Sequence, residues 1–397
     1  MNFTISNRMS GVEGSAIREI LKLASDPNII SFGGGNPAAD AFPIREIAEI
    51  ANRALAEQPV SMLQYSLSEG YPPLREALGA FLRKNDGIGR ESDRILIVSG
   101  SQQAADLATK ALVNEGDAVL VEEPSFVGCL NCFRTYGAKL AGVPMDEDGV
   151  NLAALEEAMA REKNVRFFYT IPNFQNPTGI TMSYEKRKRV YELAQKYGVV
   201  ILEDNPYGEL RFAGEPVPAI KTLDTDGRVI YCGSFSKVMA PAFRVAFLCA
   251  DEGLMGPLVV GKQCADVHTN VLFQHICAEY LTKYDYAAHI AEIRELYAKK
   301  CRLMLAALER EFHPSVRFTR PQGGLFISCT LPDGADAAEF VAEGIRRGVA
   351  CVPGFAFMTD QKKPSSFFRM NFSTPTDEQI EKGVRILGRL THERFGS

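Results

Sequence analysis

The chain has 397 residues, a formal net charge of -5, 46% hydrophobic residues and 23% charged residues. This length suits two domains, or one large domain with a smaller lobe, and the composition excludes wholesale disorder. The net negative charge does not favour binding to nucleic acid. No apolar stretch approaches the ~20 residues that are needed to cross a bilayer. Nine scattered cysteines, an odd number, favour reduced thiols and a cytoplasmic setting.

The first predicted elements are a short helix over residues 14–24 and the glycine run 33–35, which lets backbone approach a ligand. Six continuous apolar runs then predict buried strands: residues 95–98, 118–121, 165–170, 199–202, 229–232 and 245–249. Helical spacing lies between them, at residues 104–113, 152–161 and 184–197. Continuous apolar strands indicate a sheet covered on both faces, so we expect an α/β fold with a mainly parallel sheet.

The pattern changes after about residue 287. A long charged helix over residues 290–312 leads to predicted strands at 316–318, 325–329 and 367–372 and to a last helix at 377–392. This alternation is typical of a smaller α+β lobe. We therefore expect three parts: an N-terminal segment that joins the small domain, a large domain and a small C-terminal domain, at residues 1–44, 45–286 and 287–397.

Polar side chains follow several predicted strands, at the carboxyl edge where α/β sheets bind their ligands. Lys237 follows the strand at 229–232, preceded by Ser234 and Ser236 and followed by Arg244. A lysine amine can form a Schiff base with a carbonyl compound, and the hydroxyls and guanidinium can hold a phosphate. Taken alone, a Ser-x-Ser-Lys segment is more often a surface turn.

Three further strand ends present suitable groups. Asp204 follows the strand at 199–202, where a carboxylate would keep a pyridine nitrogen protonated. The Asn176 amide comes after the strand at 165–170, and Ser101 opens the helix after 95–98, whose N–H groups make an anion site. Each group has an ordinary structural explanation by itself. Four apt groups at four strand ends favour a shared site for a phosphorylated aromatic aldehyde.

At this point the chain resembles the fold-type I pyridoxal-phosphate aminotransferases of class I/II. The matching segments occur in the family's order: SGSQQ at 99–103, NPTG at 176–179, EDNPY at 203–207, SFSK at 234–237, PQGGLF at 321–326 and FRMNFS at 368–373. Segments 15–21, 64–75 and 266–270 resemble the 2-aminoadipate/kynurenine aminotransferase branch. The resemblance implies a seven-stranded-type sheet sandwiched by helices and a cofactor, pyridoxal 5'-phosphate.

The resemblance also implies the roles of single residues. Lys237 is expected to bind the cofactor as an imine and to move the substrate proton, Asp204 to pair with the pyridine nitrogen, and Arg369 to hold the substrate carboxylate in a bidentate fork. Tyr207 and Asn176 are expected at the phenolic oxygen of the ring. The residues expected at the phosphate are Ser101, Gln102, Ser234, Ser236 and Arg244.

Four more residues complete the implied site. Phe126 is expected to stack on the ring, where tyrosine is commoner in this branch, and Gly35 lies in the run near the substrate. Tyr65 and Asn270 are expected to reach the phosphate of a neighbouring subunit, which implies a homodimer with shared sites. Arg18 either reaches a distal substrate carboxylate or is a solvated arginine on an amphipathic helix.

These residues predict an aminotransferase that moves the amino group of an aminoadipate-, aromatic- or aliphatic-type donor to a 2-oxo acid. The expected acceptor is 2-oxoglutarate. The alternative enzyme is a pyridoxal-phosphate lyase that eliminates at the β-carbon, since the same residues would hold the cofactor. A non-enzymatic alternative is the ligand-sensing half of a transcription regulator. That alternative needs an additional N-terminal DNA-binding region, for which the pattern leaves no room.

Overall fold

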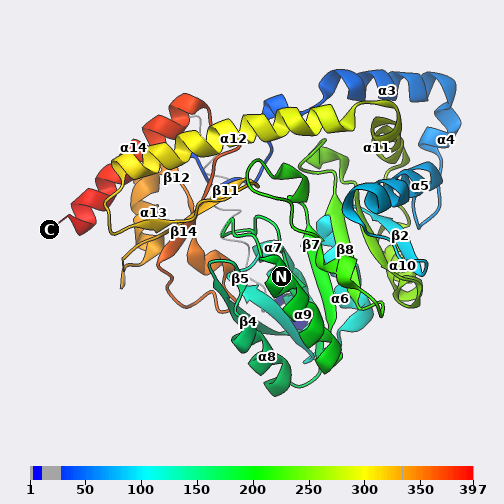
Figure 1. The fold of residues 1–397 in the computed structure, drawn as a ribbon, viewed down its shortest axis with the longest axis horizontal. Coiled ribbons are helices and arrows are strands. Elements are labelled where there is room, and N and C mark those ends of the chain that lie inside the picture. Colours follow the sequence, from blue (N-terminus) through cyan, green and yellow to red (C-terminus); the bar gives the residue numbers. More distant parts are fainter. Residues whose placement is uncertain (1–2, 11–27, 333, 397) are drawn as a thin grey trace.

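The structure, a computed structural model, describes residues 3–10, 28–332 and 334–396. Its centre is an eight-stranded sheet in the order β2-β9-β8-β7-β6-β3-β4-β5 (Figure 1). The strands are β2 (Asp93–Val98), β3 (Ala118–Glu123), β4 (Lys139–Asp146), β5 (Gly149–Val150), β6 (Val165–Thr170), β7 (Val200–Asn205), β8 (Val229–Ser234) and β9 (Ala246–Asp251). Only β9 and β5 run against the others, which confirms a mainly parallel sheet.

Both faces of this sheet are buried. In β3, Val119 and Val121 pack into one core while Leu120 packs into another, because successive side chains of a strand point to opposite faces. Residues of α6 (Ser101–Leu112), α7 (Val127–Thr135) and α10 (Glu252–Asp266) contribute to the first core. The second core is covered by α8 (Leu152–Arg161) and α9 (Tyr184–Tyr197), whose bounds match the predicted helices.

Two strands of the large sheet were not predicted, because one is largely exposed and the other is very short. Strand β4 lies near the sheet edge and has only one buried residue, Val143, so it shows no continuous apolar run. Strand β5 is two residues long. A prediction based on apolar runs finds the central strands, which are covered on both faces, and misses half-exposed edges.

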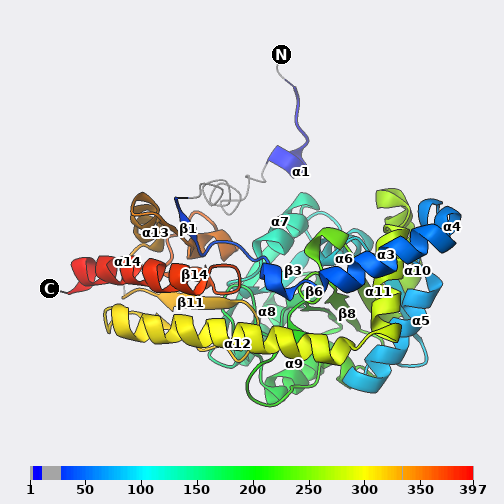
Figure 2. The ribbon, with the colours of Figure 1, turned by 90° about the horizontal axis from the view of Figure 1, so that it is seen from above.

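A smaller antiparallel sheet, in the order β10-β11-β14-β13, lies beside the large one. Its strands are β10 (Arg317–Phe318), β11 (Phe326–Thr330), β13 (Val352–Pro353) and β14 (Phe367–Asn371). Helix α13 (Ala337–Arg346) packs against β13 and β14 of this sheet, and α14 (Asp377–Phe395) packs against α13. Figures 1 and 2 show α12 (Tyr286–Glu311) running from the large sheet's region to the small one, where it packs along α14.

The segment after residue 28 joins the smaller region. Strand β1 (Ile30–Ser31) pairs in parallel with β12 (Val349–Ala350), and the Asn371 N–H donates to Phe32 O at 2.8 Å. The remaining α-helices in the described part of the chain are α1 (Asn7–Ser10), α3 (Ile44–Glu57), α4 (Pro59–Leu63), α5 (Pro72–Phe81) and α11 (Val271–Lys283). The helix predicted at 14–24 lies outside the described residues. None of the described helices is both long and apolar enough to span a membrane.

Candidate active site

The polar groups predicted at separate strand ends belong to adjacent strands of the large sheet. Asp204 is in β7 and pairs with Cys232 of β8, the strand that leads to Lys237. The Asn176 segment follows β6 on the other side of β7, and Ser101 opens α6 directly after β2. Because β2, β6, β7 and β8 run in one direction, these groups meet at one carboxyl edge.

Lys237 carries an amine in a largely desolvated position. Its Nζ donates to the Gly35 carbonyl at 2.7 Å, and no described carboxylate forms an ion pair with it. Burial, together with the positive charges of Arg369 and Arg244, lowers the pKa of Lys237 to about 8. A neutral, nucleophilic amine is therefore accessible near physiological pH, as imine chemistry and proton transfer require.

Asp204 is a buried carboxylate with one partnered oxygen. The Tyr169 hydroxyl donates to Oδ2 at 2.9 Å, whereas Oδ1 is buried and has no hydrogen-bond partner among the described residues. Burial raises the pKa of Asp204 to about 6, against the lowering effect of the Tyr169 hydroxyl and the Cys232 thiol. An orphaned acceptor of this kind fits a cationic N–H group supplied by a ligand.

Arg369 lies in β14 of the small sheet and reaches across to the large one. Its Nη1 donates to Asn176 Oδ1 at 2.7 Å and its Nη2 donates to the Gly33 carbonyl at 2.7 Å. The guanidinium carbon lies 4.2 Å from the ring centre of Phe326 and 5.0 Å from that of Phe357. Its Nε is buried without a partner among the described residues, and burial lowers its pKa to about 10. The result is a fixed cation that still has a donor for an anion.

Tyr207 lies in the same buried cluster. It is 5% exposed, and its ring makes an edge contact with Phe326 at 5.9 Å between centroids. Burial raises the pKa of the Tyr207 phenol, against the lowering effect of Arg369 and of a hydrogen bond with Asn176. The phenol is therefore protonated at neutral pH and available as a donor.

The groups predicted to hold a phosphate also lie close together. The Ser234 hydroxyl donates to Ser236 Oγ at 3.0 Å and accepts from the Ser236 N–H at 3.1 Å. Arg244 adopts a left-handed backbone, with φ of 52°, and its Nη2 donates to the Ser99 carbonyl at 3.3 Å. A Cβ at Gly100 would lie 1.9 Å from that Nη2, so only glycine fits between the guanidinium and the start of α6.

Gln102 and Phe126 border the same helix start. Gln102 Nε2 donates to the Gly128 carbonyl at 2.9 Å. A Cβ at Gly128 would lie 2.6 Å from Gln102 Oε1 and 2.7 Å from the Phe126 ring, so both side chains lie against this glycine. The Phe126 ring thus lies near the N-terminus of α6, and its stacking on the cofactor ring stays a prediction.

Tyr65 and Asn270 occupy a different position. Tyr65 is 80% exposed and makes an edge contact with the His268 ring at 5.8 Å. Asn270 is exposed and its side chain caps α11 by accepting from the Phe273 N–H at 3.2 Å. Neither side chain has a described contact with Lys237 or Asp204. Arg18 lies outside the described residues.

Several side chains of the site were missed by the sequence reasoning. Tyr169 lies on the Asp204 face of the sheet because it pairs with Leu202, two residues before Asp204. Its signal was a hydroxyl near the carboxyl end of a strand that was expected to be buried. Phe326 belongs to a recognised segment without having been assigned a role, and Phe357 gave no signal because only the fold brings it to Arg369.

These residues fit pyridoxal 5'-phosphate. The partnerless Oδ1 of Asp204 suits a protonated ring nitrogen, Lys237 suits a carbonyl carbon, and the cradle of Gly100, Arg244 and the α6 N-terminus suits a phosphate. An α/β sheet with a lysine, a carboxylate and a phosphate cradle at one carboxyl edge defines a pyridoxal-phosphate enzyme.

Comparisons with known proteins agree with this class. Residues 27–387 match the family model for aminotransferase class I and II. The chain is 39% identical over 394 residues to aromatic-amino-acid aminotransferase 1 of Thermococcus litoralis, covering 98% of this chain and 94% of the relative. It is 42% identical over 381 residues to the 2-aminoadipate transaminase of Thermus thermophilus, covering 95% and 94%.

A solved structure agrees as well. The kynurenine aminotransferase of Pyrococcus horikoshii, solved in complex with PMP, superposes with a TM-score of 0.95 at 38% identity over 99% of this chain and 98% of the other. The chain belongs to the aminotransferase class I and II family. It is an aminotransferase whose cofactor is pyridoxal 5'-phosphate and whose substrates are amino acids and their 2-oxo acids.

Proposed function

We propose that this enzyme moves the amino group of aminoadipate-, aromatic- or aliphatic-type amino acids to 2-oxoglutarate. The observation that supports this most strongly is the convergence of the Lys237 amine, the orphaned Asp204 oxygen and the Arg369 guanidinium at one edge of the sheet. The relatives named for aromatic amino acids, 2-aminoadipate and kynurenine support the range of donors.

The cofactor, when bound, supplies an electron sink that accepts the electrons of the substrate Cα–H bond. Asp204 would keep the pyridine nitrogen protonated through its partnerless Oδ1. Lys237 would hold the cofactor before substrate arrives, and its Nζ would then take the proton from the substrate Cα. The low pKa of this amine lets it accept and release a proton near neutral pH.

Arg369 binds the α-carboxylate of both substrates. Asn176 and the Gly33 carbonyl hold its two terminal nitrogens, and the rings of Phe326 and Phe357 cover its faces, so the guanidinium is oriented before substrate binds. Preorganisation lowers the entropy lost on binding. The Gly35 carbonyl borders the same space because it accepts the Lys237 amine.

The remaining residues position the cofactor. Tyr207 and Asn176 would donate to its phenolic oxygen, and Phe126 would stack on its ring. The phosphate would be held by Ser101, Gln102, Ser234, Ser236 and Arg244. The Cys232 thiol and the Tyr169 hydroxyl form hydrogen bonds with Asp204 and hold its carboxylate in place.

We further propose a homodimer in which Tyr65 and Asn270 complete the partner's phosphate site. Large hydrophobic residues are exposed on α4 and the segments near it: Val60, Leu63, Tyr65, Leu67 and Val267. The segment around Asn270 also borders the site, because the Thr269 hydroxyl lies 3.0 Å from Ser99 Oγ. Light scattering should give twice the 43.7 kDa chain mass. A monomer with full cofactor content would contradict the shared site.

The domain division at 1–44, 45–286 and 287–397 stays a proposal, and so does the cytoplasmic location. The thiol chemistry supports a reducing compartment, since all nine cysteines of the chain are free.

The deciding assay varies the acceptor. A panel of amino donors should react only when a 2-oxo acid such as 2-oxoglutarate is present, with glutamate formed in equal amount to the new 2-oxo acid. Arg369 and Lys237 serve both half-reactions, so the reaction should also run in reverse. Release of pyruvate and ammonia without any acceptor would favour the lyase and contradict the proposal.

A further inference from the structure

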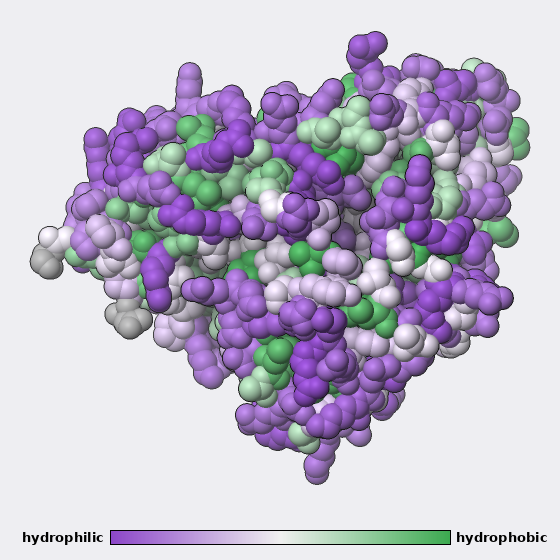
Figure 3. Space-filling view, viewed as in Figure 1, coloured by the Kyte–Doolittle hydropathy of each residue, from purple (hydrophilic) through white to green (hydrophobic). Residues whose placement is uncertain are grey.

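Lys262 of α10 is a buried lysine outside the set of residues assigned to the cofactor or the substrate. The face of the molecule in Figure 3 is mostly hydrophilic, because charged side chains are normally kept in water. Lys262 departs from this pattern, since its side chain is fully buried on a helix that packs against α6 and β2. Taking an ammonium out of water costs free energy unless partners within the protein replace the water. The partners of Lys262 therefore show what this residue holds in place.

The Lys262 ammonium contacts four side chains that belong to two segments. Its Nζ donates to Gln103 Oε1 at 2.8 Å and to Ser99 Oγ at 3.3 Å, at the start of α6. It also donates to Thr269 Oγ1 at 2.9 Å and lies 2.6 Å from Asp266 Oδ1, at the end of α10 and just beyond it. A further bond joins the two segments, because Ser99 Oγ donates to Asp266 Oδ2 at 2.6 Å. One buried charge thus ties the start of α6 to the segment before α11.

Ser99 connects this network to the groups that were predicted to hold a phosphate. Its carbonyl accepts from Arg244 Nη2 at 3.3 Å, and its N–H donates to Gln103 Oε1 at 2.7 Å. Gly100 follows with φ of 89°, and α6 begins at the next residue. Because both the backbone and the hydroxyl of Ser99 are bonded, the Arg244 guanidinium and the first N–H groups of α6 are held in one arrangement. A fixed arrangement of donors is what favours the binding of an anion.

The other segment contains a strained turn. Val267 has φ of 66° and ψ of -60°, and the N–H of the next residue donates to the Asp266 carbonyl at 2.7 Å. This is the rare form of γ-turn, and it is costly for a β-branched residue. Strained backbone persists only where the surrounding structure fixes it. Here Lys262 binds Asp266 and Thr269, on the two sides of the turn, and the segment leads directly to Asn270.

We propose that Lys262 is a positioning residue for the cofactor phosphate. Through Ser99 it fixes Arg244 relative to the start of α6, and through the turn at Val267 it fixes the position of Asn270. The inference rests on the phosphate site of the proposed function, because Lys262 acts through the residues of that site.

Titration of the apoenzyme with pyridoxal 5'-phosphate and with pyridoxal, which lacks the phosphate, tests this role. The visible absorbance of the bound compound gives the Kd of each. Lys262→Met should raise the Kd of pyridoxal 5'-phosphate by about 10–100-fold, the usual range for a group that orients a ligand's direct contacts. The Kd of pyridoxal should be unchanged. Ser99→Ala, which removes only the hydroxyl tie to the network, should act in the same direction by a smaller factor, and it keeps the test decisive if Lys262→Met does not fold.

Two control variants separate the outcomes. Lys221→Met removes another fully buried lysine, which is paired with two carboxylates, and it should lower the unfolding temperature without changing either Kd. Arg244→Gln removes a direct phosphate contact and should raise the Kd of pyridoxal 5'-phosphate alone.

The proposal is overturned if Lys262→Met and Ser99→Ala keep the native Kd of pyridoxal 5'-phosphate, or if they raise both Kd values equally. The phosphate site itself still stands in those cases when Arg244→Gln acts on pyridoxal 5'-phosphate alone. A native Kd of pyridoxal 5'-phosphate in Arg244→Gln would contradict the phosphate site and the role of Lys262 together.

Discussion

The two edges of the large sheet treat buried charges in opposite ways. At the amino-terminal edge of the parallel strands, Lys221 is fully buried, and its Nζ lies 2.8 Å from Asp93 Oδ1 and 2.8 Å from Asp224 Oδ2. The same amine donates to the Val229 carbonyl at 2.9 Å. All three donor positions of the ammonium are therefore used within the protein.

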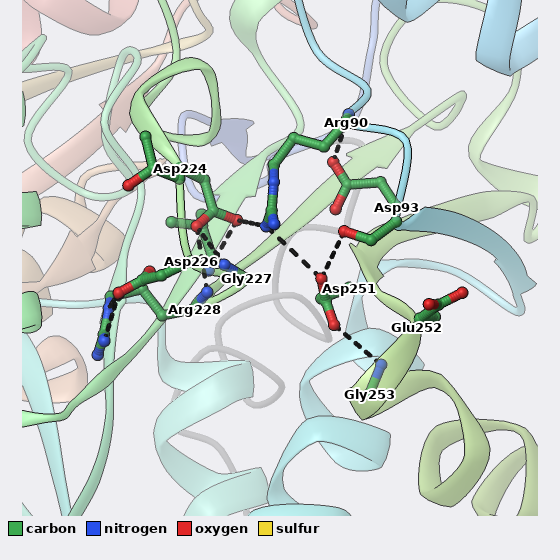
Figure 4. Close-up of polar contacts among 12 residues, drawn as sticks. Arg90, Asp93, Asp224, Asp226, Gly227, Arg228, Asp251, Glu252 and Gly253 are labelled. Carbon is green, nitrogen blue, oxygen red and sulfur yellow. Dashed lines mark hydrogen bonds and ion pairs between the residues drawn. The ribbon is translucent and has the colours of Figure 1, made fainter.

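The carboxylates of this edge are equally well served. Asp224 Oδ1 accepts the backbone N–H groups of Gly227 at 2.9 Å and Arg228 at 3.1 Å, and Arg90 Nη1 lies 3.5 Å from Asp224 and 3.6 Å from Asp251 (Figure 4). At the carboxyl-terminal edge, Asp204 Oδ1 and Arg369 Nε have neither a hydrogen bond nor an ion-pair partner among the described residues, whereas Arg90 Nη1, which also makes no hydrogen bond, still lies beside two carboxylates. Breaking a buried charge network in which every group has a partner destabilises the fold. Buried groups that lack a partner within the protein are candidates for contacts with a ligand.

The largest expected effect on activity comes from removing the Lys237 amine. It lies at the carboxyl-terminal edge, called the open edge below because its buried groups lack partners. Lys237→Ala should lower kcat by about 10⁴-fold or more, because it removes both the attachment of the cofactor and the group that moves the proton. The apoenzyme's unfolding temperature should not fall, since Lys237 has no counter-charge to lose. Steady-state kinetics measures kcat and calorimetry measures the unfolding temperature. Lys110→Ala, at an exposed position of α6, is the control. Appreciable turnover in Lys237→Ala would contradict the assigned role.

Removing the Lys221 amine at the amino-terminal edge, called the closed edge below, should have the opposite effect and change stability rather than activity. Lys221→Met leaves Asp93 buried without a cation and Asp224 with Arg90 alone at 3.5 Å, and should lower the free energy of unfolding by about 3–5 kcal/mol. The kcat of the folded protein should be unchanged, because the network lies at the far edge from Lys237. Lys196→Met, which removes an exposed ion pair, should leave stability nearly unchanged in the same urea titration. Lost kcat with unaltered stability would reverse the comparison.

Arg369→Lys sharpens the claim that the open edge is shaped for a carboxylate. An ammonium cannot form a bidentate fork, so KM for the amino donor should rise and kcat/KM should fall by roughly 30–150-fold, or about 2–3 kcal/mol. The absorbance of the bound cofactor should persist. Arg320→Lys, an exposed arginine in the small region, is the matched control and should keep native kinetics. An unchanged KM in Arg369→Lys would place carboxylate binding elsewhere.

The smallest effect is a pH dependence of the apoenzyme. The folded pKa of Asp204 is raised to about 6, above the ordinary value near 4, so ionisation destabilises the empty fold. Stability should therefore fall by about 2 kcal/mol as pH rises through the window from 4 to 6. Asp204→Asn should lack this fall and be the more stable apoenzyme at pH 7, with near equality at pH 4.5. Urea titrations at the two pH values measure it, and a less stable Asp204→Asn apoenzyme at pH 7 would count against the open-edge account.

The sequence predicted the residues of the carboxyl-terminal edge better than those of the amino-terminal edge. Lys237 and Asp204 could be placed because each follows a continuously apolar strand, and strand ends of a parallel sheet share an edge. The Lys221 network gave no signal, since Asp93 lies at the start of a strand 128 residues before Lys221 and only the folded chain brings the two together. For the same reason the Phe357 ring over Arg369 could not be foreseen, while Tyr65 and Asn270 stay predictions that a second subunit must test.

The claim on which the site depends is that one cofactor is held between Lys237 and Asp204. Reduction of the holoenzyme with borohydride, followed by peptide mass spectrometry, tests it most directly. The visible absorbance should vanish, and the mass of the reduced cofactor should appear on the peptide that contains Lys237 and on no other. A label on a different lysine, or an unlabelled Lys237 peptide after complete bleaching, would contradict the account.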